Sequence, residues 1–294
     1  MNKKFGKILK GIGGFYYVQT DNAVVECRAR GLFRNKSVMP YVGDNVEIEI
    51  SDDGTGYIIS IEKRKNFFVR PPVSNVDLLI IVVAMANPSP DLMFLDKMLI
   101  QAIAADVEAV ICFNKSDLTS DDSTESLAQI YRNLGYKTFV TSTFTGTGIK
   151  DLKNFIKGKV ISVCGFSGVG KSSILNAILG EKHMQVGEIS KKLSRGKHTT
   201  REVSLVEYAK GSYLADTPGF SSLDLPEQIT KENLREYFIE FSDYSLECKF
   251  SDCAHTNPKF CGVCKALYDK KISESRYNNY INLYELLKDK KEWK

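Results

Sequence analysis

The chain has 294 residues, which is long enough for two or three domains with separate cores. Its apolar fraction of 43% is ordinary for a globular protein. With 40 Lys and Arg against 36 Asp and Glu, the net charge of +4 permits a nucleic-acid partner but does not require one.

Features that would direct export or membrane insertion are missing from the sequence. The N-terminus is basic, but glycines interrupt it before an apolar signal core can form. The longest apolar run, residues 78–86, is about half as long as a membrane helix requires. We therefore expect a cytoplasmic, monomeric protein with no membrane partner. In a reducing compartment, clustered members of the seven cysteines indicate a metal site rather than disulfides.

Residues 1–66 are predicted to form an N-terminal domain of β-strands alone. Five short strands in about 60 residues suggest a small Greek-key barrel of the OB type. Arg28 and Arg30 should face one side of a strand, because side chains alternate. That side is a candidate RNA surface, although a solvated strand face explains it about as well. The clearest β-prone runs are residues 15–19, 23–30, 45–50 and 57–61.

A polar, proline-containing joint ends this domain, and the pattern then changes. Continuous apolar runs at 77–84 and 109–113 predict strands buried on both faces of a parallel sheet. We assign residues 67–225 to an α/β domain and residues 226–294 to a small helical domain, so the whole chain is a multidomain α/β protein. Helix-length segments in the α/β domain are 94–105, 123–134 and 172–179.

A complete phosphate-binding loop lies between a predicted strand, residues 159–164, and a predicted helix. Successive backbone N–H groups and the positive end of the helix suit a triphosphate. Lys171 should reach the β- and γ-phosphates, and Ser172 should ligate Mg²⁺. The predicted loop residues are Gly165, Phe166, Ser167, Gly168, Val169, Gly170, Lys171, Ser172 and Ser173.

A second strand-to-loop junction carries the tetrapeptide Asn114-Lys115-Ser116-Asp117. The Asp117 carboxylate can accept both the N1–H and the N2–H₂ protons of guanine, which adenine does not offer together. Asp117 therefore predicts selection of GTP over ATP, although such a tetrapeptide alone is often only a turn. A third junction, with Ser142 and Thr143, could close over the base.

Two further segments resemble the switch regions of a GTPase. Asp216 follows a predicted strand and could hold Mg²⁺ through water, while the Gly219 amide could contact the γ-phosphate. In the segment 195–200, a threonine hydroxyl would complete the Mg²⁺ shell. Thr199 and Thr200 both remain candidates, and we favour Thr200.

The order of these pieces is unusual, because the guanine tetrapeptide precedes the phosphate loop, whereas the loop ordinarily comes first. The carboxyl ends of parallel strands meet at one edge of a sheet, which is where open α/β sheets bind ligands. Permuting the order of the strands would leave such a site in place. We therefore expect one nucleotide site assembled from scattered segments.

Taken together, these motifs resemble the circularly permuted, ribosome small-subunit-dependent GTPases of the RsgA/YjeQ type over nearly the whole chain. Small departures are Thr143, where alanine is usual, Arg201, where a third threonine is common, and an extra cysteine, Cys264. The segments that carry the resemblance are 27–31, 42–44, 70–71, 75–77, 114–117, 165–173, 196–200, 216–220 and a cluster of cysteines and a histidine within 248–264, the Cys/His cluster.

The resemblance implies a domain order and a function. It implies an OB domain that binds ribosomal RNA, a permuted GTPase core and a C-terminal zinc domain. It further implies hydrolysis of GTP to GDP, stimulated by the small (30S) ribosomal subunit, in late maturation of that subunit. GTP with Mg²⁺, the small subunit and its rRNA are the partners so implied.

The Cys/His cluster offers three thiolates and one imidazole, a set typical of structural zinc. The spacing is Cys248-x₄-Cys253-x-His255-x₅-Cys261. A small domain of this kind should need the metal to fold, and the cluster suggests no catalytic role. Cys264 lies at CxxC spacing from Cys261 and could compete for the site, but the family pattern favours Cys261.

The catalytic group is the least defined part of the prediction. Phe220 stands where Ras-like enzymes carry the glutamine that orients the attacking water, so intrinsic turnover should be slow. His198 is the best internal candidate for the missing group, and the resemblance points the same way. An RNA-binding assembly module gated by GTP, with little role for hydrolysis, is the alternative. An ATP-using protein with a zinc-containing nucleic-acid arm is a weaker one.

Overall fold

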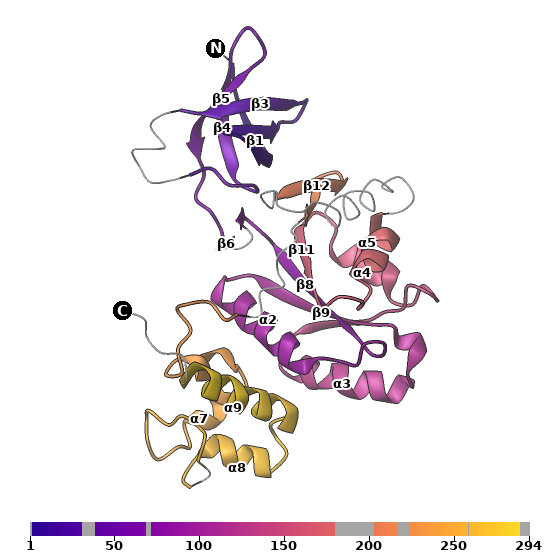
Figure 1. Ribbon diagram of the computed structural model, residues 1–294, viewed down its shortest axis with the longest axis vertical. Helices are drawn as coiled ribbons and strands as arrows, with labels where there is room; N and C mark the ends of the chain where they lie inside the picture. The colour runs from indigo at the N-terminus through magenta and orange to yellow at the C-terminus, as the bar shows by residue number, and fades with distance from the viewer. Residues whose placement is uncertain are drawn as a thin grey trace.

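A computed structural model describes residues 2–30, 39–68, 72–179, 203–216, 224–257 and 259–288. Figure 1 shows a β-barrel at one end, a sheet flanked by helices in the middle, and a group of helices at the other end. Among the described residues, no helix combines the length and the apolar character needed to cross a membrane.

The N-terminal strands close into a five-stranded barrel, as the sequence predicts. Their order is β1-β2-β3-β5-β4, and β1 also pairs with β4 to close the ring. All neighbouring pairs are antiparallel except β3 with β5, which is the Greek-key arrangement of an OB fold. The strands are β1 (Asn2–Ile12), β2 (Phe15–Gln19), β3 (Val24–Ala29), β4 (Asn45–Ile50) and β5 (Gly56–Ile61).

A buried carboxylate fastens the barrel to the segment that follows it. Asp44 is fully buried and accepts hydrogen bonds from Arg64 at 2.7 and 2.8 Å. It also accepts one from Ser74 Oγ at 2.6 Å and one from the backbone N–H of Tyr41 at 2.8 Å. Ser74 lies in the short hairpin β6 (Phe67–Phe68) and β7 (Val73–Ser74). One charged side chain thus ties the end of the barrel to the start of the next domain.

The α/β domain contains a six-stranded sheet in the order β10-β9-β8-β11-β13-β12. All neighbours are parallel except β12, which runs antiparallel to β13. The phosphate-loop strand β11 lies centrally, although three strands of the sheet precede it in the chain. The strands are β8 (Leu78–Ala84), β9 (Glu108–Asn114), β10 (Lys137–Val140), β11 (Val160–Cys164), β12 (Ser204–Ala209) and β13 (Ser212–Asp216).

Helices cover both faces of this sheet, which explains the unbroken apolar runs. In β8, Leu79 and Ile81 join the core beneath α2 and α3, whereas Leu78 and Ile80 join the core beneath α4 and α5. The first helix starts before the expected residue 94, because Asp91 caps it by accepting from the Phe94 N–H at 2.8 Å. The helices are α2 (Leu92–Ala104), η1 (Ser116–Leu118), α3 (Asp121–Asn133), α4 (Ile149–Phe155) and α5 (Lys171–Leu179).

The barrel and the α/β sheet are hydrogen-bonded to each other. Strand β1 pairs with β12 at Lys10 and Ser204, so the two sheets form one continuous sheet of eleven strands. No local pattern in the sequence predicts this pairing.

The C-terminal helices form a third core that includes part of the α/β domain. Tyr280 and Leu283 are buried in it, and Tyr277, Ile281 and Tyr284 pack against it, so residues at helical spacing bury one side of the last helix. Ile100 of α2 is buried in the same core, so α2 lies between the sheet and this domain. The elements are η3 (Leu234–Tyr237), α7 (Phe241–Ser245), α8 (Gly262–Tyr268) and α9 (Glu274–Lys288).

Candidate functional site

The loop between β11 and α5 requires glycine at two positions, because a backbone oxygen lies too close to one and a buried side-chain amide too close to the other. A Cβ on Gly165 would lie 2.5 Å from the Val82 carbonyl oxygen, and one on Gly170 would lie 2.3 Å from Asn114 Nδ2. Both glycines also have positive φ, 148° and 96°. The loop is therefore held against the neighbouring strands β8 and β9. The loop lies at the carboxyl ends of the parallel strands, which is where ligands bind in α/β folds.

Lys171, the first residue of α5, folds back over the loop. Its Nζ donates to the carbonyl oxygens of Gly165 at 2.8 Å and Phe166 at 2.7 Å. Burial lowers the pKa of this ammonium. A cation held by two carbonyls at the start of a helix is placed to receive an anion. Ser172 and Ser173 follow it in the first turn of α5.

Asn114 joins the predicted guanine tetrapeptide to the phosphate loop. It is buried, and its Nδ2 donates to the carbonyl oxygen of Val169 at 2.9 Å. Its Oδ1 accepts from the hydroxyl of Thr141 at 3.1 Å. One amide thus links three strand-to-loop junctions, at the ends of β9, β10 and β11. Lys115 has left-handed backbone geometry, and its Nζ donates to the Asn87 carbonyl.

Asp117 lies at the surface, and a residue of the third junction orients its carboxylate. Ser142 Oγ donates to Asp117 Oδ1 at 2.5 Å and accepts from the backbone N–H groups of Phe144 and Thr145. These two backbone donors use the lone pairs of the hydroxyl, so its proton is available to orient the carboxylate. The structure brings Asn114, Asp117 and Ser142 together. Thr143 is half-buried in the same turn.

Several predicted site residues lie outside the described part of the chain. These are His198, Thr199, Thr200, Gly219 and Phe220. Asp216 ends β13, which runs parallel to β11 with Ala215 opposite Ser162. Its backbone thus reaches the same edge of the sheet as the phosphate loop.

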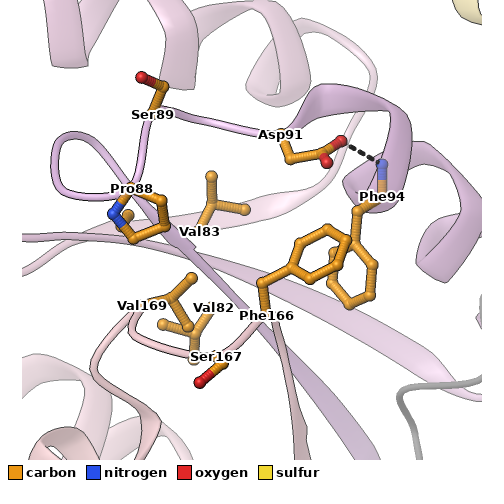
Figure 2. Close-up of a pocket in the computed structure, with 10 residues that line it drawn as sticks. Val82, Val83, Pro88, Ser89, Asp91, Phe94, Phe166, Ser167 and Val169 are labelled. Carbon is orange, nitrogen blue, oxygen red and sulfur yellow. Dashed lines mark hydrogen bonds between the residues drawn. The ribbon is translucent and has the colours of Figure 1, made fainter.

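A cavity that no sequence motif predicts lies beside the loop. It has a volume of about 280 Å³ and is lined mainly by apolar side chains of the loop, β8 and the start of α2. Figure 2 shows the rings of Phe166 and Phe94 side by side among the residues that line it, and their centroids are 4.5 Å apart. The sequence signal was Phe166 itself, a bulky ring in a glycine loop that needs a place to pack. This contact joins the phosphate loop to α2.

The four predicted zinc ligands gather in the C-terminal domain. The ligand atoms of Cys248, Cys253, His255 and Cys261 all lie within 4.8 Å of one another. The sulfurs of Cys248 and Cys261 are 3.9 Å apart, and His255 Nδ1 lies 3.6 and 3.4 Å from them. Zinc bonds to sulfur and imidazole nitrogen in a tetrahedron give edges of about 3.8 and about 3.6 Å. The donor set and its spacing therefore fit zinc.

The surroundings suit a bound cation as well. Burial lowers the pKa of His255 to about 4, so its ring is neutral at neutral pH, as a metal ligand must be. The N–H of Gly262 points at the sulfur of Cys248 at 3.2 Å, and the N–H of Cys264 points at the sulfur of Cys261 at 3.3 Å. Such donors stabilise thiolates.

Cys264 lies beside the cluster and outside it. Its sulfur is 3.4 Å from the Tyr277 hydroxyl and 3.5 Å from the His255 carbonyl oxygen. It contributes its backbone N–H to the cluster, because α8 begins at Gly262 and turns the Cys264 side chain toward α9.

Two family models match successive parts of the chain. A family model described as the RsgA N-terminal domain matches residues 5–58, and one described as RsgA GTPase matches residues 61–226. A relative from Caldanaerobacter subterraneus subsp. tengcongensis, named small ribosomal subunit biogenesis GTPase RsgA, is 43% identical over 292 residues, covering 99% of this chain and 98% of its own. One of the same name from Clostridium novyi is 44% identical over 280 residues, covering 95% and 96%.

Two solved structures share the fold along the whole chain. YjeQ from Thermotoga maritima superimposes with a TM-score of 0.85 at 35% identity, covering 99% of this chain and all of that one. YloQ, described as a circularly permuted GTPase, gives a TM-score of 0.81 at 33% identity, covering 100% and 98%. The α/β domain described above is thus a circularly permuted GTPase domain.

Proposed function

The chain belongs to the RsgA GTPase family, and from this premise we propose that it binds GTP at the phosphate-loop edge of the sheet and hydrolyses it during late maturation of the small ribosomal subunit. The names of its relatives support the role in subunit biogenesis. The single observation that carries the nucleotide site is the 2.9 Å hydrogen bond from Asn114 to Val169. It joins the predicted guanine-binding and phosphate-binding segments, which lie 55 residues apart in the chain.

Guanine recognition is assigned to the tetrapeptide and the third junction. Asp117 would accept the two guanine protons, with its carboxylate oriented by Ser142. Asn114 would hold the base-binding segment against the loop, and Lys115 and Ser116 complete it. Thr143 would lie against the base from the next loop. Exposure of Asp117 beside the buried Asn114 supports this division of roles.

Phosphate binding is assigned to the loop and the first turn of α5. Residues 165–173 would surround the phosphates with backbone N–H groups, and Lys171 would exchange its two carbonyl partners for phosphate oxygens. Ser172, Thr200 and Asp216 would hold Mg²⁺, with the Gly219 amide at the γ-phosphate. When bound, Mg²⁺ would neutralise charge that develops on the phosphates.

The catalytic step is proposed to depend on His198 and on the ribosomal subunit. Phe220, at the position of the usual glutamine, has no group that can orient water, so the isolated protein should turn over slowly. His198 would supply the missing polar contact to the attacking water. Docking on the small subunit would bring it into place and so accelerate hydrolysis.

The N-terminal and C-terminal domains are proposed to bind RNA and a metal ion, respectively. The barrel is proposed to contact ribosomal RNA, with Arg28 on a strand face and its guanidinium 4.6 Å from the Phe15 ring. The C-terminal cluster is proposed to hold one structural Zn²⁺, and the protein to act as a cytoplasmic monomer. None of these parts is assigned a chemical step.

GTP turnover with and without purified small subunits tests the proposal. Slow release of phosphate by the protein alone and a strong increase with subunits are expected, with GDP as the product. Binding of GTP without any increase would instead favour the GTP-gated RNA-binding module. Displacement of GTP by equimolar ATP would contradict the role of Asp117 and the proposal with it.

A further inference from the structure

We propose that Ser245 is a positioning residue of the C-terminal metal site, which fixes the tautomer of His255 so that the bare Nδ1 faces the cysteine sulfurs. The inference rests on the zinc site proposed above and adds to it a residue outside the ligand set. Ser245 is the last residue of α7, and its hydroxyl lies 3.2 Å from His255 Nε2.

The direction of that hydrogen bond follows from counting protons. Ser245 Oγ lies 2.6 Å from the carbonyl oxygen of Phe241, one helical turn earlier. A carbonyl oxygen can only accept, so the single proton of the hydroxyl is committed to Phe241. Toward His255, the same oxygen can therefore only accept.

The imidazole must then carry its hydrogen on Nε2. A neutral imidazole has one N–H, and the ring is 1% exposed, so little water competes for it. Nδ1 is left with a free lone pair, and it is the nitrogen that lies 3.6 Å from the Cys248 sulfur and 3.4 Å from the Cys261 sulfur. The opposite tautomer would place two acceptors in contact at Nε2 and would put a hydrogen on Nδ1, which then has no lone pair for the metal.

The rest of the environment fixes the ring in the same orientation. The Phe241 ring meets the His255 ring edge-on, with centroids 5.5 Å apart. The backbone of His255 has a positive φ of 55°, and its carbonyl oxygen accepts from the Tyr277 hydroxyl at 2.8 Å. Helix α7 thus contacts the ring through Phe241 and through the hydrogen bond at Nε2, while α9 binds the His255 backbone through Tyr277. Removing the Ser245 hydroxyl would release the only one of these contacts that distinguishes the two nitrogens.

The experiment uses the full-length, zinc-loaded protein. Two-bond ¹H–¹⁵N correlation of the histidine rings assigns which nitrogen carries the proton, and competition with a chromophoric chelator measures zinc affinity. The wild type should show a protonated Nε2 and a metal-bound Nδ1 for His255. Ser245→Ala should lose roughly 10- to 100-fold in zinc affinity, the usual effect of removing an outer hydrogen-bond partner of a ligand. Ser245→Thr, which keeps a hydroxyl, should recover most of it.

Ser242→Ala is the matched control. Ser242 is an exposed serine of the same helix that donates to the Ile239 carbonyl oxygen at 2.8 Å, and its loss should leave zinc affinity unchanged. A wild-type ring with the proton on Nδ1, or equal zinc affinity of Ser245→Ala and Ser242→Ala, would overturn the proposal. A wild-type protein without stoichiometric zinc would refute the zinc site itself, and the assay of zinc content separates that result from the others. The tautomer is read on the wild type, so a poorly folded variant does not remove the test.

Discussion

The carboxylate of Asp96 accepts a 2.6 Å hydrogen bond from the guanidinium of Arg276, a residue 180 positions later in the chain. Both side chains are buried, at 0% and 1% exposed. Arg276 also binds both oxygens of Glu240, at 2.8 and 2.9 Å, and Asp96 accepts from Asn279 at 2.7 Å. The helix α2 that packs against the phosphate loop is therefore joined to the C-terminal domain by buried charges.

Arg276→Met should destabilise the protein strongly. The substitution keeps the apolar volume but leaves two carboxylates without their cation, which typically costs about 3–5 kcal/mol. Denaturant unfolding followed by fluorescence measures the loss. Lys265→Met is the control, because Lys265 and its partner Glu247 are exposed and such pairs contribute little. Equal effects of the two substitutions would show that the buried network does not hold the domains together.

Asn114→Ala should weaken GTP and GDP binding to a similar extent. It removes the donor to Val169 and the acceptor of Thr141, both in buried surroundings. Loss of such bonds costs about 1–3 kcal/mol, or roughly 5- to 150-fold in affinity. Titration with a fluorescent guanine nucleotide measures it. Asn133→Ala, at the exposed end of α3, should bind like the wild type, and a normal affinity for Asn114→Ala would argue against the junction described here.

Asp117→Ala should remove the preference for guanine. Without the carboxylate, neither base is favoured by its ring protons, so selectivity for GTP over ATP should fall by at least about 100-fold. Competition of both nucleotides for the fluorescent ligand gives the ratio. Retained selectivity would mean that another group reads the base.

His198→Ala should reduce subunit-stimulated hydrolysis by roughly 10²- to 10⁴-fold, the range for loss of a group that handles the attacking water. GTP affinity should stay close to that of the wild type, because the nucleotide contacts assigned above do not involve this side chain. Single-turnover phosphate release and equilibrium binding separate the two quantities. Parallel loss of both, or of neither, refutes a catalytic role.

Cys261→Ser should abolish stoichiometric zinc binding, whereas Cys264→Ser should retain it. The two cysteines are three residues apart, but only the Cys261 sulfur lies within the cluster. The Cys264 sulfur faces the Tyr277 hydroxyl, a contact that serine can keep. Metal content by atomic absorption decides between them, and the reverse result would move the ligand assignment to Cys264.

The three strand-to-loop junctions could be predicted from the sequence, because each has a local signature. Asn114 ends one parallel strand, Ser142 and Gly165 come just after two others, and parallel strands bring their carboxyl ends to one edge. Thr141 and Phe94 could not be predicted, because their partners in the site are set by how strands and helices pack, and neither residue belongs to a motif.

The buried ion pair of Arg276 is a clearer example of a contact that the sequence does not predict. It lies in a helix rich in polar residues, where an arginine is ordinarily solvated, and its partner Asp96 lies in another domain. The choice between Cys261 and Cys264 was open for a similar reason. Spacing allows both, and only the rotation of α8 directs one sulfur to the ligand cluster and the other to Tyr277.

The pairing of Lys10 with Ser204 also has a consequence for the edge of the α/β sheet. Without the barrel, β12 would end its sheet as an open edge with unpaired backbone groups, a template for other chains. Strand β1 covers the start of that edge at Ser204 and also belongs to a closed ring, which has no edge there to offer. The N-terminal domain thus covers part of the edge of the α/β sheet. A fragment that begins after it would be expected to aggregate through that exposed edge.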